Sequence, residues 1–252
     1  MSKVVLNNHC FALFYKHLSK KNFVGDDQYL LTDFEIVYRI NIVLRMQIND
    51  QCILFDKEYN MLCSIVRINK KEVLVSVVRY EKNHVMQPFI KLYLPLLKRV
   101  HLEDAISFAG QVGVSEIQLI VTEKSARTLV KDERLDRIMI SACEQAKQYV
   151  VPRICEPIKL HEALNNLSLD QVLVCSQDGV LFSELQKKFI NNHKLQTVGL
   201  FIGPEQDFTQ EEYRLLRKYN ISSVSLGSLV LQASIATCVA IGLLRASFIT
   251  KK

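Results

Sequence analysis

Metal-binding patterns are missing from this sequence. Seven of its 252 residues are cysteines, and none of them forms a C-x-x-C pair, so a zinc site of that kind is not indicated. The six histidines also lack metal-ligand spacing, and we expect each of them at the surface. We therefore expect no bound metal, and reduced thiols in a cytoplasmic protein.

Long apolar runs and nucleotide-binding glycine motifs are missing as well. The first residues hold no apolar segment long enough for a secretion signal. The longest apolar stretch, residues 233–244, has roughly half the ~20 residues that span a bilayer. It predicts a buried or dimer-facing helix and no membrane segment. Neither G-x-G-x-x-G nor G-x-S-x-G occurs, so a dinucleotide or triphosphate loop and a serine nucleophile are not indicated.

The composition is that of a globular protein with a basic surplus. Hydrophobic residues make up 49% and charged residues 23%, which is enough apolar content for one large or two small cores. The net charge of +6 fits a phosphate-rich partner. Many proteins without a nucleic-acid role carry a similar surplus, so the charge alone decides little.

The first third of the sequence is β-rich. Short apolar segments at residues 51–55, 61–68 and 72–80 are separated by polar turns at residues 56–60 and 69–71. This spacing predicts a small barrel or meander that serves as an accessory domain. A polar segment that ends at Pro88 follows, and we place the boundary there, between a domain at residues 1–84 and a second at residues 85–252.

The second domain alternates between strand and helix patterns. Strands are predicted at residues 89–94, 117–121, 172–175, 197–202 and 223–226. Helices are predicted at residues 103–112, 134–149, 210–219 and 229–248. This alternation is typical of an α/β fold with a mostly parallel sheet.

Two turns from strand to helix could carry chemistry. Gly203, Pro204 and Glu205 follow the strand at residues 197–202, and loops at the carboxyl ends of parallel strands are where α/β proteins bind ligands. An ordinary connecting loop, with a capping box from Thr209 to Glu212, explains the same residues. The segment that begins with Leu226-Gly227 is a second such turn. A polar pair at Glu144-Gln145 is either a solvated helix face or part of a site.

Taken in order, these segments resemble the SPOUT-class methyltransferases that modify uracil N3 in 16S ribosomal RNA. Residues 202–209 read I-G-P-E-Q-D-F-T, where the family reads I-G-P-E-G-G-F-S, and residues 226–236 match its L-G-x-x-I-L-R-x-E-T-A. Residues 144–152 match E-Q-x-x-R-x-x-V-P, and residues 122–125 match T-E-R-S. Residues 43–45 and 49–50 correspond to V-L-R and G-D of the family's PUA-like barrel.

The resemblance implies a SPOUT trefoil-knot domain with a mostly parallel sheet, preceded by a small β-rich, PUA-like RNA-binding barrel. It also implies S-adenosyl-L-methionine as cofactor, a homodimer packed through the C-terminal helix, and 16S ribosomal RNA or the small subunit as partner. The cofactor-binding positions that carry over are Val174, Cys175, Ile202, Gly203, Glu205, Leu226, Gly227 and Leu231.

Catalytic and RNA-binding positions carry over from the same resemblance. Glu205 and Gln145 are the candidates for catalysis, and Arg39, Arg45 and Lys124 are the candidates for RNA binding. Further basic residues of the barrel could guide RNA or could form a solvated face, and these are Lys16, Lys20, Lys21 and Arg67.

Several charged positions of the family are replaced in this chain. Gln206 and Asp207 stand for two glycines of the loop, and Gln232 and Ser234 stand for an arginine and a glutamate of the last motif. Other departures are Phe108, Gln111 and Gln148. These changes leave the general base unassigned. They also leave two alternatives: a weakened or inactive RNA-binding relative that keeps the knot, and a SPOUT methyltransferase that acts on another RNA site.

Overall fold

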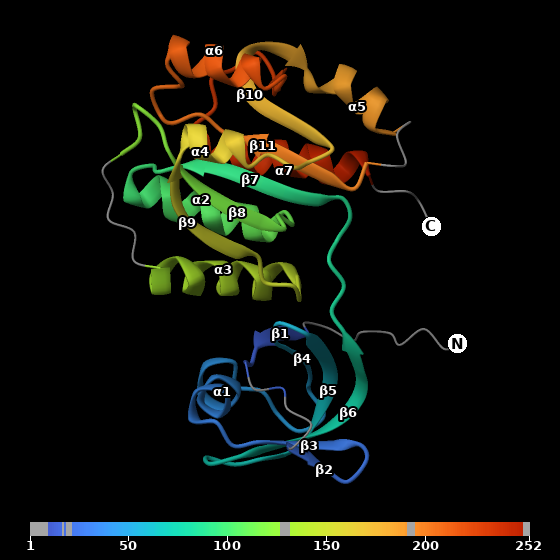
Figure 1. Cartoon of the computed structure of the whole chain (residues 1–252). Coiled ribbons are helices and arrows are strands. Elements are labelled where there is room, and N and C mark those ends of the chain that lie inside the picture. Colours follow the sequence, from blue (N-terminus) through green and yellow to red (C-terminus); the bar gives the residue numbers. More distant parts are fainter. Residues whose placement is uncertain (1–9, 17, 19–21, 127–131, 191–194, 249–252) are drawn as a thin grey trace. The chain divides into compact units, whose positions relative to one another are not determined.

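The computed structural model describes residues 10–16, 18, 22–126, 132–190 and 195–248 of the chain (Figure 1). The chain divides into two compact units, Met1–His84 and Val85–Lys252, and each is described by itself. None of the helices within the described ranges is long and apolar enough to cross a membrane.

The N-terminal unit is built on a six-stranded sheet with the order β1-β4-β5-β6-β3-β2. The strands are β1 (Phe11–Phe14), β2 (Phe23–Val24), β3 (Gln28–Leu31), β4 (Gln51–Phe55), β5 (Tyr59–Ile68) and β6 (Val73–Lys82). Only β1 and β4 pair in parallel; the other neighbours are antiparallel. The sequence predicted β4, β5 and β6 but missed the three shorter strands, which have too few residues to show a period.

Local side-chain hydrogen bonds fix the turns of this unit. The Asp56 carboxylate accepts from the backbone N–H groups of Glu58 and Tyr59 at 2.8 and 2.7 Å. The Asn69 amide oxygen does the same for Lys71 and Glu72 at 2.8 and 3.0 Å. Both predicted turns are therefore confirmed, each as a turn that its first polar side chain closes.

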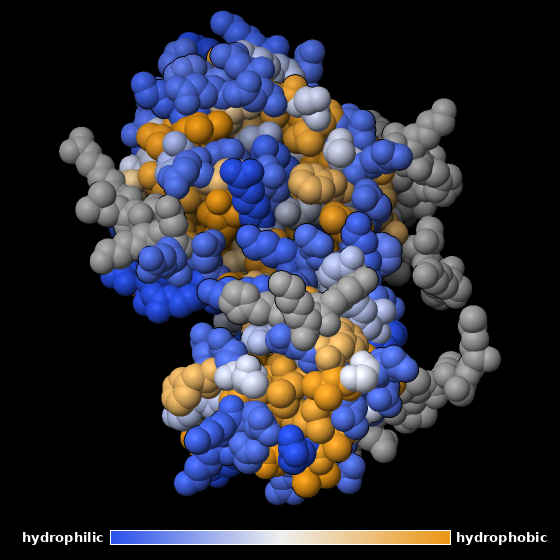
Figure 2. Space-filling model, turned by 60° about the horizontal axis from the view of Figure 1, so that its bottom comes forward, coloured by the Kyte–Doolittle hydropathy of each residue, from blue (hydrophilic) through white to orange (hydrophobic). Residues whose placement is uncertain are grey.

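A short helical segment lies between β3 and β4. Asp33 caps α1 (Phe34–Tyr38) by accepting from the N–H groups of the helix's first turn, and the π-helix η2 (Arg39–Val43) continues it. Ile40 is fully buried, whereas Phe34 is 79% exposed. Figure 2 shows apolar side chains on the surface of this unit, and the exposed ones on α1 and η2 are Phe34, Tyr38, Ile42 and Val43.

The C-terminal unit is built on a six-stranded, fully parallel sheet with the order β12-β10-β11-β7-β8-β9. Its strands are β7 (Phe89–Pro95), β8 (Glu116–Val121), β9 (Arg153–Lys159), β10 (Gln171–Leu181), β11 (Thr197–Phe201) and β12 (Ser222–Ser225). Its helices are α2 (Arg99–Gln111), α3 (Asp132–Ala146), α4 (Leu160–Asn165), α5 (Phe182–Ile190), α6 (Gln210–Lys218) and α7 (Ala233–Ser247). The predicted α/β fold with a mostly parallel sheet is confirmed.

The prediction that the last helix begins at Leu229 is wrong. The helix starts at Ala233, with Gln232 as its N-terminal cap in extended backbone. Residues 228–232 form a loop instead. The apolar residues of that loop look like helix in the sequence because their periodicity continues that of α7. The sequence also missed β9, α4 and α5, which are short or mixed in polarity.

Aromatic stacking joins the two central strands of the sheet. Tyr93 on β7 and Phe201 on β11 are register partners, and their rings stack with centroids 4.2 Å apart. Burial, followed by the charge of Glu116, raises the pKa of Tyr93 to about 12. The phenol therefore stays neutral, as its place in the core requires.

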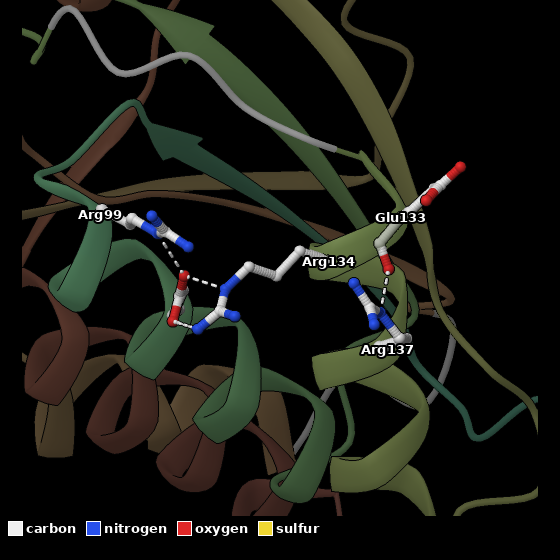
Figure 3. Close-up of polar contacts among 5 residues, drawn as sticks. Arg99, Glu133, Arg134 and Arg137 are labelled. Atoms are coloured by element: carbon white, nitrogen blue, oxygen red, sulfur yellow. Dashed lines mark hydrogen bonds and ion pairs between the residues drawn. The ribbon is translucent and has the colours of Figure 1, made fainter.

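An ion cluster joins the helices that cover one side of the sheet. The Glu103 carboxylate on α2 accepts from Arg99 at 3.0 Å and from Arg134 on α3 at 2.5 and 2.8 Å (Figure 3). The hydrogen bonds from Arg134, and then those from Arg99, lower the pKa of Glu103 to about 2. Close by, Gly110 lets α2 approach α3, because a Cβ there would lie 2.8 Å from the Met139 sulfur.

Arg245 ties the end of α7 to the beginning of the unit. Its guanidinium donates to the carbonyls of Pro88 at 2.7 Å and of Gly113, and to the Ser115 hydroxyl at 3.2 Å. Burial lowers the pKa of Arg245 to about 10, so the group is still charged at neutral pH. The first strand, the α2–β8 turn and the last helix therefore depend on one side chain.

We expect Arg245→Met to lower the free energy of unfolding by about 2–3 kcal/mol, because buried carbonyls lose their donor. Arg214→Met is the matched control. It removes an exposed pair with Glu211 and should cost no more than about 0.5 kcal/mol. Urea unfolding followed by circular dichroism measures both, and equal costs would contradict the role of Arg245.

Candidate functional site

A cavity of about 470 Å³ lies at the carboxyl edge of the parallel sheet. Four segments line it: the start of α2, the middle of β10, the loop after β11, and the loop from β12 into α7. The lining residues are Lys98, His101, 175–177, 202–205, Asp207, 225–227, 229–233 and Ala236. The cavity has the size and position expected of a small-molecule site in an α/β sheet.

A bulge in β10 opens one wall of the cavity. The strand pairs with β12 up to Cys175, leaves it, and pairs with Val224 again at Val180. Gly179 permits this return, because a Cβ there would lie 2.5 Å from backbone atoms of Val224. Burial raises the pKa of Cys175 to about 12. Its thiol is therefore protonated and is not a nucleophile at neutral pH.

The loop after β11 is closed by Asp207. This residue has a φ of 60°, and its carboxylate accepts from the Phe208 N–H and the Tyr213 hydroxyl, both at 2.8 Å. Its own N–H donates to the Pro204 carbonyl at 2.8 Å. The positive φ is the conformation that glycine adopts most readily, which accounts for the glycine of the resembling motif. Here an aspartate adopts it and uses its charge within the loop.

The predicted capping box of α6 is confirmed, and it reaches further than the helix. Thr209 accepts from the Glu212 N–H at 3.2 Å, and one Glu212 carboxylate oxygen accepts from the Thr209 N–H at 2.9 Å. The other oxygen accepts from the Glu123 N–H at 2.9 Å, in the loop after β8. Next to it, Lys124 donates to the Gln206 carbonyl at 2.9 Å. Glu212 thus caps a helix and holds the loop after β8, and Lys124 of that loop holds the loop that lines the cavity.

The loop after β12 supplies the apolar wall. Gly227 has a φ of 143°, and a Cβ there would meet nothing within 4 Å, so the space beside its backbone is open. Ser225 holds the turn by donating from its hydroxyl to the Gly227 carbonyl at 3.1 Å. Beyond it, Leu229 and Val230 are 76% and 81% exposed.

A polar cluster occupies one corner of the cavity. One carboxylate oxygen of Glu205 forms a short hydrogen bond with Nδ1 of His101, and the other lies 3.7 Å from the Lys98 ammonium. On the other side of the ring, Nε2 of His101 lies 2.8 Å from the Gln232 side-chain nitrogen. Glu205 and Gln232 come from two separate loops, and His101 comes from the first turn of α2.

The expectation that each histidine lies at the surface is wrong for His101. Its side chain is only 28% exposed, and its partners lie 104 and 131 positions further along the chain. Spacing within the sequence cannot show contacts of that range. The available signal was the position of His101, a few residues beyond the carboxyl end of the predicted strand at residues 89–94.

The structure brings most of the residues expected to bind a cofactor together. Seven of the eight line the cavity: Cys175, Ile202, Gly203, Glu205, Leu226, Gly227 and Leu231. Val174 is buried beside them in β10.

Gln145, expected to act in catalysis, does not line the cavity. It lies on the last turn of α3, and the chain continues from there to the amino end of β9. That end of the sheet is opposite the edge that carries the cavity, because the strands are parallel.

The residues expected to contact RNA are distributed over both units. Arg39 and Arg45 belong to the N-terminal unit, where Arg45 is exposed with a φ of 52°. Lys124 belongs to the C-terminal unit, near the cavity loop. Lys20 and Lys21 lie outside the described residues. Among the residues that are described, no group of three or more His, Cys, Asp or Glu side chains could hold a metal ion.

A parallel sheet with a ligand-sized cavity at its carboxyl edge defines the C-terminal unit as an α/β ligand-binding domain. Residues 85–245 match the family model described as RNA methyltransferase domain. The chain therefore belongs to the RNA methyltransferase domain family.

Relatives of known name match over most of the chain. It is 29% identical over 221 residues to ribosomal RNA small subunit methyltransferase E of Rickettsia conorii, covering 86% of this chain and 88% of that protein. It is 26% identical over 229 residues to the protein of that name from Buchnera aphidicola, covering 87% and 88%.

Solved structures share the fold. A Legionella pneumophila methyltransferase in complex with its cofactor SAM superposes with a TM-score of 0.76 at 23% identity, covering 95% of this chain and 98% of that one. A ribosomal RNA small subunit methyltransferase E from Neisseria gonorrhoeae, bound to S-adenosyl methionine, gives a TM-score of 0.77 at 21% identity, covering 94% and 98%.

The Asp207 turn can be tested by substitution. We expect Asp207→Ala to lower the free energy of unfolding by about 2–3 kcal/mol, because alanine is strained at positive φ and two hydrogen bonds are lost. Asp207→Gly removes the same hydrogen bonds but adopts the same φ, so it should cost about 1 kcal/mol less than alanine. Urea unfolding decides between them, and equal values would show that the backbone conformation is not strained.

Proposed function

We propose that this protein transfers the methyl group of S-adenosyl-L-methionine to N3 of a uridine in 16S ribosomal RNA of the small subunit. The membership of the RNA methyltransferase family and the names of the relatives support this proposal. The observation that carries it is the cavity at the carboxyl edge of the sheet. A cytoplasmic location goes with the proposal, because the ribosomal RNA substrate is there.

The chemistry of the lining fits the proposed cofactor. Ile202, Leu226 and Leu231 provide apolar contacts for a flat base, and Gly227 leaves room beside the backbone. The carboxylates of Glu205 and Asp207 line the same cavity and would attract a cation such as a sulfonium. When bound, the cofactor supplies an electrophilic methyl group. The protonated thiol of Cys175 does not compete for that group.

The finer architecture is part of the proposal. We propose that residues 85–252 form a deep trefoil knot and that residues 1–84 form a PUA-like RNA-binding barrel, as the resemblance implies. In this arrangement Arg39, Arg45 and Lys124 contact RNA phosphates, and the net charge of +6 supports such contacts. The target uridine would have to be unpaired or flipped out to reach the cavity.

We also propose that the protein is a homodimer packed through α7. The outward face of α7 carries Ile235, Val239, Gly242 and Leu243, and Ile235 is 44% exposed. A Cβ on Gly242 would meet nothing within 4 Å, so this face of the helix is open. The only charged residue in Ala233–Ser247, Arg245, points inward. An open apolar face of this kind is typical of a subunit interface.

The methyl-transfer proposal predicts binding and reaction with defined reagents. We expect calorimetry to show binding of S-adenosylmethionine, and small subunits from a strain lacking the gene to accept labelled methyl at one uridine N3, located by mass spectrometry. Gly227→Leu should weaken cofactor binding at least about 10-fold, because its side chain fills the open space. Gly25→Leu is the control, since Gly25 also has a positive φ, of 73°, but lies in the other unit.

The alternatives give different results in the same experiment. Absence of cofactor binding would refute the enzyme. Cofactor binding without methyl transfer would indicate an inactive RNA-binding relative, and methyl at another nucleotide would indicate a different RNA site.

The dimer proposal predicts a mass of two chains in light scattering after gel filtration. Gly242→Glu should give monomers, because a buried unpaired charge at the interface is costly. Gln210→Glu adds the same charge at an exposed position on α6 and should leave the dimer intact. A monomeric wild-type protein would refute the proposal.

A further inference from the structure

The corner cluster determines which nitrogen of His101 carries the proton. The Ser234 hydroxyl donates to the Gln232 side-chain oxygen at 3.4 Å. The Gln232 side-chain nitrogen then faces Nε2 of His101 at 2.8 Å, and an amide N–H can only donate. With the Gln232 amide in this orientation Nε2 accepts, and the proton of the neutral ring is then on Nδ1, where it is donated to Glu205.

This arrangement presents a basic lone pair to the cavity. A carboxylate that accepts from Nδ1–H fixes the tautomer and the ring orientation, and it stabilises the imidazolium that forms when Nε2 takes a proton. Glu205 does so for His101. Both His101 and Gln232 line the cavity, so this nitrogen borders the proposed cofactor site, beside which the methyl acceptor would have to be bound.

We propose that His101 is the general base that removes the N3 proton of the uridine, and that Glu205 positions it. This inference rests on the proposed function. His101 takes the role of the general base, which the family's motifs leave unassigned in this chain. In the resting protein the Gln232 side-chain N–H donates to Nε2 of His101. When the uridine binds, the Gln232 side chain moves away and the uracil N3–H becomes the donor to Nε2.

The step is balanced in atoms and charge. The N3–H bond breaks and its proton forms a bond to Nε2 of His101. The N3 electron pair forms a bond to the methyl carbon, and the carbon–sulfur bond breaks with its electrons going to sulfur. The imidazolium, paired with the Glu205 carboxylate, then loses its proton to water.

The neighbouring charges favour His101 over Glu205 as the base. Both oxygens of Glu205 are engaged, one by His101 and the other by Lys98 at 3.7 Å. The Asp207 carboxylate, on the same loop, is held by Phe208 and Tyr213.

His101→Asn separates a base from a structural residue. The asparagine amide can still donate to Glu205 but cannot accept a proton. With S-adenosylmethionine and unmodified small subunits, we expect the single-turnover rate of His101→Asn to be about 100-fold or more below that of the wild-type protein. Its affinity for the cofactor should stay within about threefold of the wild-type value. We expect the wild-type rate to rise with pH, because only a neutral imidazole can take up the N3 proton, and we expect His101→Asn to lose this rise. His161→Asn changes a histidine whose side chain is 57% exposed on α4 and should keep the wild-type rate and profile.

A second measurement does not depend on activity. Nitrogen-15 NMR of labelled histidines in the free protein should show His101 as the Nδ1–H tautomer, and Glu205→Gln should change that signal. An Nε2–H tautomer, or an unchanged rate and pH profile in His101→Asn, would overturn the base assignment alone. If the wild-type protein transfers no methyl group, the proposed function itself fails, whatever the tautomer.

Discussion

Parallel hydrogen bonding across six strands is the constraint on which the C-terminal unit depends. Because every strand points the same way, all of the strand-to-helix loops emerge at one edge. The stacked pair Tyr93–Phe201 fixes β7 against β11 at the centre of that edge. Segments more than a hundred residues apart in the sequence, such as those of His101 and Glu205, therefore meet at this edge.

Hydrogen bonds from single side chains hold the loops in addition to packing. Asp207 closes one turn, Ser225 another, and Glu212 links a helix start to the loop after β8. None of these hydrogen bonds involves the side chains of the corner cluster, His101, Glu205 and Gln232. The chain can therefore carry substitutions at Gln232 and Ser234 while the loops keep their shape. These two residues are linked to His101 in one hydrogen-bonded chain.

The sequence pattern predicted the strand–helix alternation of the C-terminal unit, because most of its strands are apolar runs. Only the family resemblance identified the cavity loops, since a turn with glycine fits an ordinary connection equally well. It missed β9 and the three short strands of the N-terminal unit, whose residues are too few or too mixed to show a period. It also extended α7 back to Leu229, since apolar periodicity does not distinguish a helix from an apolar loop. His101 was missed because its partners are distant in the sequence.

The clasp made by Arg245 has a mechanical consequence. Pro88 lies near the start of the C-terminal unit and Arg245 near its end, and the two are joined by a hydrogen bond. A pull on the two ends of the unit would load this single guanidinium first. The strands that build the cavity would bear tension only after the clasp had opened.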